Sequence, residues 1–254
     1  MSKKFALNRR ILIVGEGRET EYNYFVGFRT EYGNDLKAAA TSMSVARGKG
    51  GDARGIVKTA IKERTKFQPN TKLGDRVLLL LDAEGPGNVP GGGRAPELPA
   101  AEKLAADNGI EIIYSCPSFE YWLLCHFESI SRGQFADCAA VIAALDKKWT
   151  SVSKAAYDKA DPDVFGRVAH LLAAARAQTL QIDLHHIKTS GSARHINPSA
   201  QVYELIAILI GARSGKKCPR AGTWKLISDA GVTQQLNKGD TMPQHDGNPV
   251  HWRL

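Results

Sequence analysis

Cysteine is scarce in this sequence, and its spacing fits neither a disulfide framework nor a zinc site. No two cysteines form a CxxC pair, and none has the spacing of zinc ligands. We therefore expect a cytoplasmic protein whose cysteines are all reduced thiols: Cys116, Cys125, Cys138 and Cys218.

Long apolar runs are also missing. No stretch approaches the roughly 20 residues that a helix needs to span a bilayer. Residues 1–10 are charged and lack the apolar segment of a signal peptide. We therefore expect neither membrane insertion nor export. With 254 residues, of which 43% are hydrophobic, the chain is long and apolar enough to bury a sizeable core.

Acidic residues are outnumbered by basic ones. The chain has 34 Lys and Arg against 26 Asp and Glu, which gives a formal net charge of +8. Such a surface attracts polyanions and speeds their encounter. Nucleic acid is therefore the predicted partner, although many basic proteins bind none and charge alone leaves the question open.

Short apolar runs at residues 10–14, 76–81 and 110–114 predict buried strands of a parallel sheet. Helical patterns alternate with them, and we expect Thr20 and Asp52 to cap two of the helices. Strands that alternate with helices indicate an α/β fold: a Rossmann-like, mostly parallel sheet flanked by helices.

The rest of the chain is more helical, and we predict three regions. An α/β core spans 1–130, a helical region that completes the domain spans 131–211, and a basic extension with little periodicity spans 212–254. The basic, glycine-rich stretch 46–51 lacks P-loop spacing, and we favour a flexible connector over a phosphate cradle.

Acidic side chains follow each of the three predicted strands. Glu16 follows the first, Asp82 and Glu84 follow the second, and Glu120 opens the helix after the third. The carboxyl ends of parallel strands converge on one crevice, where carboxylates repel one another unless a cation neutralises them. Hard oxygen ligands suit Mg²⁺ or Mn²⁺. An acid alone is more often a helix cap or a solvated turn, but the repeated pattern favours a metal site.

Two segments resemble signatures of the RloB-like family. Residues 16–25, EGRETEYNYF, resemble its EGxxTExxYF opening, and residues 115–127, SCPSFEYWLLCHF, resemble its SNPxFExWLLLHF motif. Weaker similarity is found at Tyr157-Asp158-Lys159 and at residues 197–199, so the resemblance covers about residues 10–210.

The resemblance implies a Toprim-like fold and a nuclease. RloB-like proteins are similar to Toprim domains, in which a glutamate after the first strand and a later DxD hold Mg²⁺. Glu16 matches that glutamate, and Asp82-Ala83-Glu84 stands in the DxD place but departs from it in the second acid. The family's occurrence in bacterial anti-phage and abortive-infection loci implies a defence effector with an ATPase partner.

Within this picture, Asp82 and Glu84 are the predicted metal ligands. Glu16 is a predicted ligand or general acid/base, and Glu120 a ligand or a carboxylate of a second metal. All four are therefore candidate catalytic residues.

Further candidates have strong alternative explanations. Glu21 and His126 are candidates to support the metal ligands, although a first-turn helix acid and a core histidine are the plainer interpretations. Arg18, Lys188 and Arg194 are candidates for phosphate contacts, or else solvated loop charges.

Three functions compete at this point. The leading one is an Mg²⁺-dependent nuclease that acts on RNA such as tRNA, or on DNA. The second is a non-catalytic sensor module that binds nucleic acid or a partner, because Glu84 departs from the DxD pattern. The third is a phosphoryl-transfer enzyme that acts on a nucleotide.

Overall fold

The computed structural model describes residues 9–39, 41–84, 94–127, 134–190 and 196–210, and beyond them 212–213, 222–226, 232–237, 240–245 and 251–253. Its main feature is a five-stranded sheet of order β2-β1-β3-β4-β5. The first four strands pair in parallel and β5 pairs antiparallel to β4. The strands are β1 (Arg9–Val14), β2 (Thr41–Ala46), β3 (Arg76–Asp82), β4 (Glu111–Cys116) and β5 (Ser199–Ala200). This mostly parallel α/β sheet confirms the predicted fold class.

Strand order creates a switch point between β1 and β3. The chain leaves β1 to form β2 on one side and then returns to form β3 on the other side of β1. Connections that depart in opposite directions leave a crevice at the carboxyl ends of the two central strands. Glu16 and Asp82 follow or end these strands, so the topology alone brings them together.

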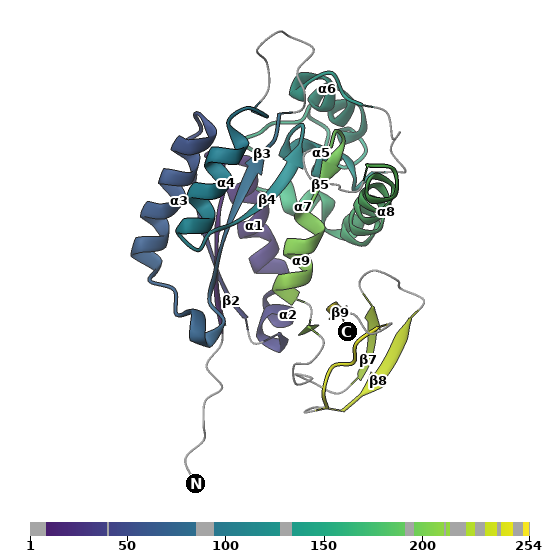
Figure 1. Cartoon of the computed structure of the whole chain (residues 1–254). Coiled ribbons are helices and arrows are strands. Elements are labelled where there is room, and N and C mark those ends of the chain that lie inside the picture. The colour runs from purple at the N-terminus through teal and green to yellow at the C-terminus, as the bar shows by residue number, and fades with distance from the viewer. Residues whose placement is uncertain are drawn as a thin grey trace.

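Helices cover both faces of the sheet (Figure 1). On one face, α3 and α4 pack over the side chains of Leu12, Val14 and Leu79. On the other face, α1, α5 and α9 pack on the sheet and α2 contacts β2, while α7 packs on α1, α6 on α5, and α8 beside β5 and α9. The helices are α1 (Thr20–Glu31), α2 (Gly33–Ala38), α3 (Ala53–Phe67), α4 (Leu98–Asp107), α5 (Phe119–Leu124), α6 (Cys138–Trp149), α7 (Val164–Val168), α8 (Leu172–Ser190) and α9 (Val202–Ile210), with short 3-10 turns at Thr71–Leu73 and Ala169–Leu171.

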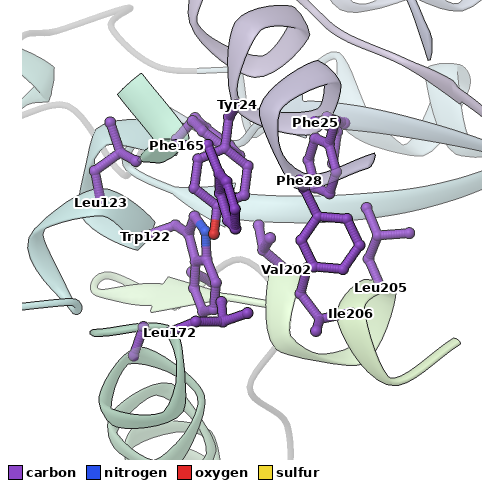
Figure 2. Packing of buried hydrophobic residues seen from close by; sticks show 14 of the residues in the cluster. Tyr24, Phe25, Phe28, Trp122, Leu123, Phe165, Leu172, Val202, Leu205 and Ile206 are labelled. Atoms are coloured by element: carbon purple, nitrogen blue, oxygen red, sulfur yellow. The ribbon is translucent and has the colours of Figure 1, made fainter. Parts of the chain in front are cut away.

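Aromatic side chains of α1 anchor the larger core. Figure 2 shows Tyr24 and Phe28 projecting from α1 toward Phe165, with Trp122 of α5 beside them. The Tyr24 and Phe165 rings meet edge to face, with their centroids 4.9 Å apart. Gly27 permits this approach, because a Cβ built there would lie 2.7 Å from the Cβ of Phe165. Burial of each such ring contributes about 1.5–3 kcal/mol, so this core fixes α1 and the residues that precede it.

The C-terminal residues form a second, antiparallel sheet that the sequence pattern did not indicate. Its order is β6-β9-β7-β8, with strands β6 (Ala212–Arg213), β7 (Gly222–Leu226), β8 (Thr233–Leu236) and β9 (His251–Arg253). Trp224, Leu236, Met242 and Trp252 form its own small core. The second sheet lies toward the amino ends of the parallel strands (Figure 1). Arg9, at the start of β1, donates to the carbonyl of Ile208, so the end of α9 lies beside those amino ends. The second sheet follows α9 in the chain and contacts this helix.

Local predictions had mixed outcomes. Asp52 caps α3 as expected, because its carboxylate accepts from the Gly55 amide at 2.8 Å. The prediction for Thr20 was wrong: it is the first residue of α1, and its hydroxyl donates to the Lys159 carbonyl instead. None of the described cysteines forms a disulfide. Among the described helices, none has the length and apolar character needed to cross a membrane.

Candidate active site at the carboxyl edge of the sheet

A cleft of about 250 Å³ opens where β1 and β3 end. It lies between the start of α1, the start of α5 and a segment near residue 159. We call it the acidic cleft, and its lining residues are Glu16, Gly17, Arg18, Glu19, Thr20, Glu21, Gly50, Asp82, Phe119, Glu120 and Lys159. Three of the four acids predicted to be catalytic therefore share one cavity.

Among the described residues, the hydrogen-bond partners of the Glu16 carboxylate all contact one of its two oxygens. Its Oε2 accepts from the backbone amide of Asp82 at 2.8 Å and from Arg94 Nη1 at 2.6 Å. Its Oε1 accepts no hydrogen bond from any described residue, while the side chain lines the cleft. A carboxylate fixed through one oxygen presents the other in a defined direction, as metal-ligating carboxylates commonly do.

Arg94 organises the loops around Glu16 and was not predicted from the sequence. Its guanidinium also pairs with Glu84 at 2.9 Å and donates to the carbonyl oxygens of Asp82 and Gly51. This side chain is only 10% exposed, so the arginine is a buried link between separate loops. Glu84 is turned toward Arg94 and is not among the residues that line the cleft.

Asp82 and Glu21 face the cleft with their charges poorly compensated. Burial, and then the nearby carboxylates of Glu16, Glu21 and Glu120, raise the pKa of Asp82 well above its ordinary value. Burial, followed by Glu16 and Glu120, raises the pKa of Glu21 to about 6. No described residue donates a hydrogen bond to the Asp82 carboxylate, whereas Glu21 accepts one from the Gly17 amide at 3.3 Å. The negative charge of these carboxylates therefore favours the binding of a proton or a cation in the cleft.

Glu120 is buried, and both of its carboxylate oxygens have partners. The Ser118 hydroxyl donates to its Oε2 at 2.7 Å, while Lys159 Nζ lies 2.8 Å and the Tyr157 hydroxyl 3.5 Å from its Oε1. Neither Tyr157 nor Lys159 was predicted as a site residue. The weak similarity of residues 157–159 to the family was the signal that could have identified them.

The oxygens that remain available fit a hard divalent cation. Mg²⁺ is often bound by one or two carboxylates, with waters and substrate phosphates completing its octahedron. Glu16 Oε1 and the Asp82 carboxylate supply such a pair at the switch point. The part of the chain that the structure describes holds no group of three or more His, Cys, Asp or Glu arranged for a metal. An ion here would therefore depend on water and phosphate ligands.

The glycine-rich stretch 46–51 is bonded to the loop that carries Glu16. The Gly48 amide donates to the Gly17 carbonyl at 2.8 Å, and the Gly50 amide donates to the Glu16 carbonyl at 3.0 Å. These bonds tie the stretch to the loop that carries Glu16, whereas we had expected a flexible connector. Gly50 itself lines the cleft.

Gly48→Ala is expected to destabilise the protein by about 1–3 kcal/mol through overpacking. A Cβ at this position would lie 1.9 Å from the Glu16 carbonyl oxygen, so the two loops must separate. Thermal unfolding of the two proteins measures this loss. Gly33→Ala is the matched control, because a Cβ there meets nothing within 4 Å. Equal unfolding temperatures for both variants would contradict the close contact.

Of the three basic residues predicted to contact phosphate, one lies at the cleft. Arg18 lines the cleft. Lys188 is exposed in the last turn of α8 and is not among the lining residues, and Arg194 lies outside the described residues.

His126 lies in the core rather than at the cleft. Its Nδ1 donates to the Trp122 carbonyl at 3.0 Å, so Nε2 accepts from the Tyr24 hydroxyl at 3.3 Å. Burial lowers its pKa to about 4, and the ring is neutral at physiological pH. The core histidine is therefore the better interpretation, and no support of the cleft carboxylates is found.

Fold and cleft define an α/β protein with a carboxylate site at the switch point of a parallel sheet. The chain belongs to the RloB-like family, whose model, described as RloB-like protein, matches residues 11–209. This confirms the resemblance found in the sequence. No curated protein and no solved structure matched the chain.

Proposed function

We propose that this protein is a divalent-metal-dependent nuclease that uses Mg²⁺ or Mn²⁺ to cleave the phosphodiester backbone of RNA, such as tRNA, or of DNA. The observation that carries the proposal is the pair of carboxylates at the ends of the adjacent strands β1 and β3. Glu16 presents an oxygen that accepts no hydrogen bond from the described residues, and Asp82 presents a poorly compensated carboxylate, to the same cleft. The chain's net charge of +8 favours a polyanionic substrate.

In this proposal Glu16 and Asp82 would hold the ion, which when bound would supply Lewis acidity for activating water and stabilising the leaving oxygen. Arg94 keeps Glu16 in place, and the Asp82 amide does the same from the next strand. Arg18 contributes a positive charge to the lining, where a substrate phosphate would lie. Glu84 contributes indirectly, through its ion pair with Arg94.

The test is cleavage of labelled tRNA, single-stranded RNA and plasmid DNA by the purified protein with Mg²⁺ or Mn²⁺. Glu16→Ala and Asp82→Ala are each expected to abolish cleavage while leaving the protein folded. Glu31→Ala, at an exposed position at the far end of α1, serves as the control and is expected to retain activity. Cleavage that persists equally in all three variants would overturn the proposal.

The proposed setting is a bacterial phage-defence effector in the cytoplasm that works with an ATPase partner. Membership of the RloB-like family supports this setting, and the absence of disulfides among the described cysteines agrees with a reducing compartment. Loss of protection against phage in cells that carry Asp82→Ala would support it, and co-purification would identify the partner.

A second candidate is a non-catalytic module that binds nucleic acid or a partner protein. The position of Glu84 favours it, because the second acid of the Asp-x-Glu segment is paired with Arg94 rather than facing the cleft. Tight binding of nucleic acid with no cleavage under any metal would distinguish this function from the nuclease.

A further inference from the structure

Residues 159–161, which we call the clamp, are hydrogen-bonded through their backbone carbonyls to the first turns of α1. The Thr20 hydroxyl donates to the Lys159 carbonyl at 3.0 Å. The Asn23 side-chain amide donates to the carbonyls of Ala160 and Asp161, each at 3.2 Å. Both donors are buried and lie more than 130 positions away in sequence. Bonds of this kind fix the backbone of Lys159 relative to the loop that carries Glu16.

The head group of Lys159 is fixed as well, yet remains accessible. Nζ lies 2.8 Å from Glu120 Oε1, while the Lys159 side chain is 58% exposed and lines the cleft. An ammonium has three donors, and the structure accounts for one of them through Glu120. Burial acts to lower the pKa of Lys159, but the ion pair with Glu120 and the nearby Asp82 together outweigh it and raise the pKa. The side chain therefore carries its positive charge at neutral pH.

Glu120 is arranged to hold this lysine. Its carboxylate is 4% exposed, and both oxygens already have partners in Ser118, Tyr157 and Lys159. A metal ion would have to displace these partners, whereas Glu16 Oε1 has none to displace among the described residues. The two carboxylates thus have different environments although they share a cleft.

We propose that Lys159 binds a backbone phosphate of the nucleic acid in the acidic cleft, and that Glu120 positions Lys159 rather than ligating a metal. The inference rests on the proposed function for the substrate class. A lysine acts on phosphate as a compact point charge with rotatable donors. Held at the rim by Glu120 and by the clamp, it places positive charge beside carboxylates that would otherwise repel the substrate.

The experiment measures binding of a short labelled single-stranded RNA to the full chain in EDTA over a range of salt concentrations. Lys159→Met keeps the apolar stem and removes the charge. It is expected to weaken binding and to reduce the salt slope by about 0.7, the value for one lost phosphate contact on a single strand. Lys62→Met is the matched control, since Lys62 is exposed on α3 and outside the cleft lining. It removes the same net charge and is expected to leave the slope unchanged.

Two further variants separate positioning from metal binding. Lys159→Arg is expected to restore much of the RNA affinity. Glu120→Gln is expected to weaken RNA binding while Mn²⁺ affinity, measured by titration calorimetry, stays near that of the unmodified protein. Unchanged RNA binding in Lys159→Met, no RNA binding by the unmodified protein, or loss of Mn²⁺ binding in Glu120→Gln would each overturn the inference. If the unmodified protein binds RNA but cleaves nothing, the nuclease proposal fails while the Lys159 result still stands.

Discussion

Replacing Arg94 with alanine is expected to lower the free energy of unfolding by about 3–5 kcal/mol at neutral pH, the usual cost of removing one partner from a buried ion pair. The guanidinium joins Glu16 and Glu84, and the side chains of Arg94 and Glu16 are only 10% and 12% exposed. Without it, the carboxylate of Glu16 stays buried beside Asp82 and loses its ion-pair partner. Chemical denaturation at pH 7.5 measures the loss.

The control for this prediction is Arg76→Ala. Arg76 pairs with Glu111 at the surface, where such pairs contribute about 0–1 kcal/mol. A loss of similar size in both variants would show that Arg94 has no special part in the cleft. Added Mn²⁺ is expected to stabilise Arg94→Ala more than the unmodified protein, since an ion bound by Glu16 and Asp82 replaces the missing charge. No difference between the two in their response to Mn²⁺ would contradict a metal site beside Arg94.

The fold class could be predicted because the central strands are buried on both faces. Their residues alternate between the two cores, so β1 and β3 appear in the sequence as unbroken apolar runs. The edge strand β2 escaped prediction because Thr41, Ser42 and Ser44 interrupt its apolar character. The C-terminal strands are short and separated by Gly- and Lys-rich stretches, and their core depends on contacts between distant residues such as Trp224 and Trp252.

The site was predictable only where it coincides with strand ends. Glu16, Asp82 and Glu120 follow buried strands, and parallel pairing brings strand ends together whatever the loops do. Arg94 lies in an irregular segment where a single basic residue has no local pattern, and the signal for Lys159 was the weak family similarity of residues 157–159. Their importance comes from tertiary contacts with the acids, and these contacts also separate Glu84 and Glu120 from the carboxylates that remain available.

Glu21→Gln is expected to stabilise the protein at pH 7.5 by about 2 kcal/mol and to have little effect near pH 4.5. The folded state raises the pKa of Glu21 from 4.5 to about 6, chiefly through burial and then through Glu16 and Glu120. A carboxyl with a raised pKa favours folding fully below its unfolded pKa, and this contribution is lost as the pH rises through 6. Glutamine retains the acceptor for the Gly17 amide and removes the ionisation.

Thermal unfolding between pH 4.5 and 7.5 measures this effect, with Glu31→Gln as the exposed control on the same helix. The unmodified protein and the control are expected to lose stability relative to Glu21→Gln as the pH rises, by about 4–8 °C at pH 7.5. If the stability of the unmodified protein and of Glu21→Gln depended on pH in the same way, the raised pKa of Glu21 would be contradicted. Burial, and then the carboxylates of Glu16, Glu21 and Glu120, raise the pKa of Asp82 well above its ordinary value, which adds a loss of the same sign as the pH rises.

Protons and metal ions compete for these carboxylate oxygens, so stabilisation of the protein by Mn²⁺ should be larger at pH 7.5 than at pH 5. A cleft that is stabilised both by protons and by Mn²⁺ carries an excess of negative charge, which is the property that the proposed metal-dependent activity requires.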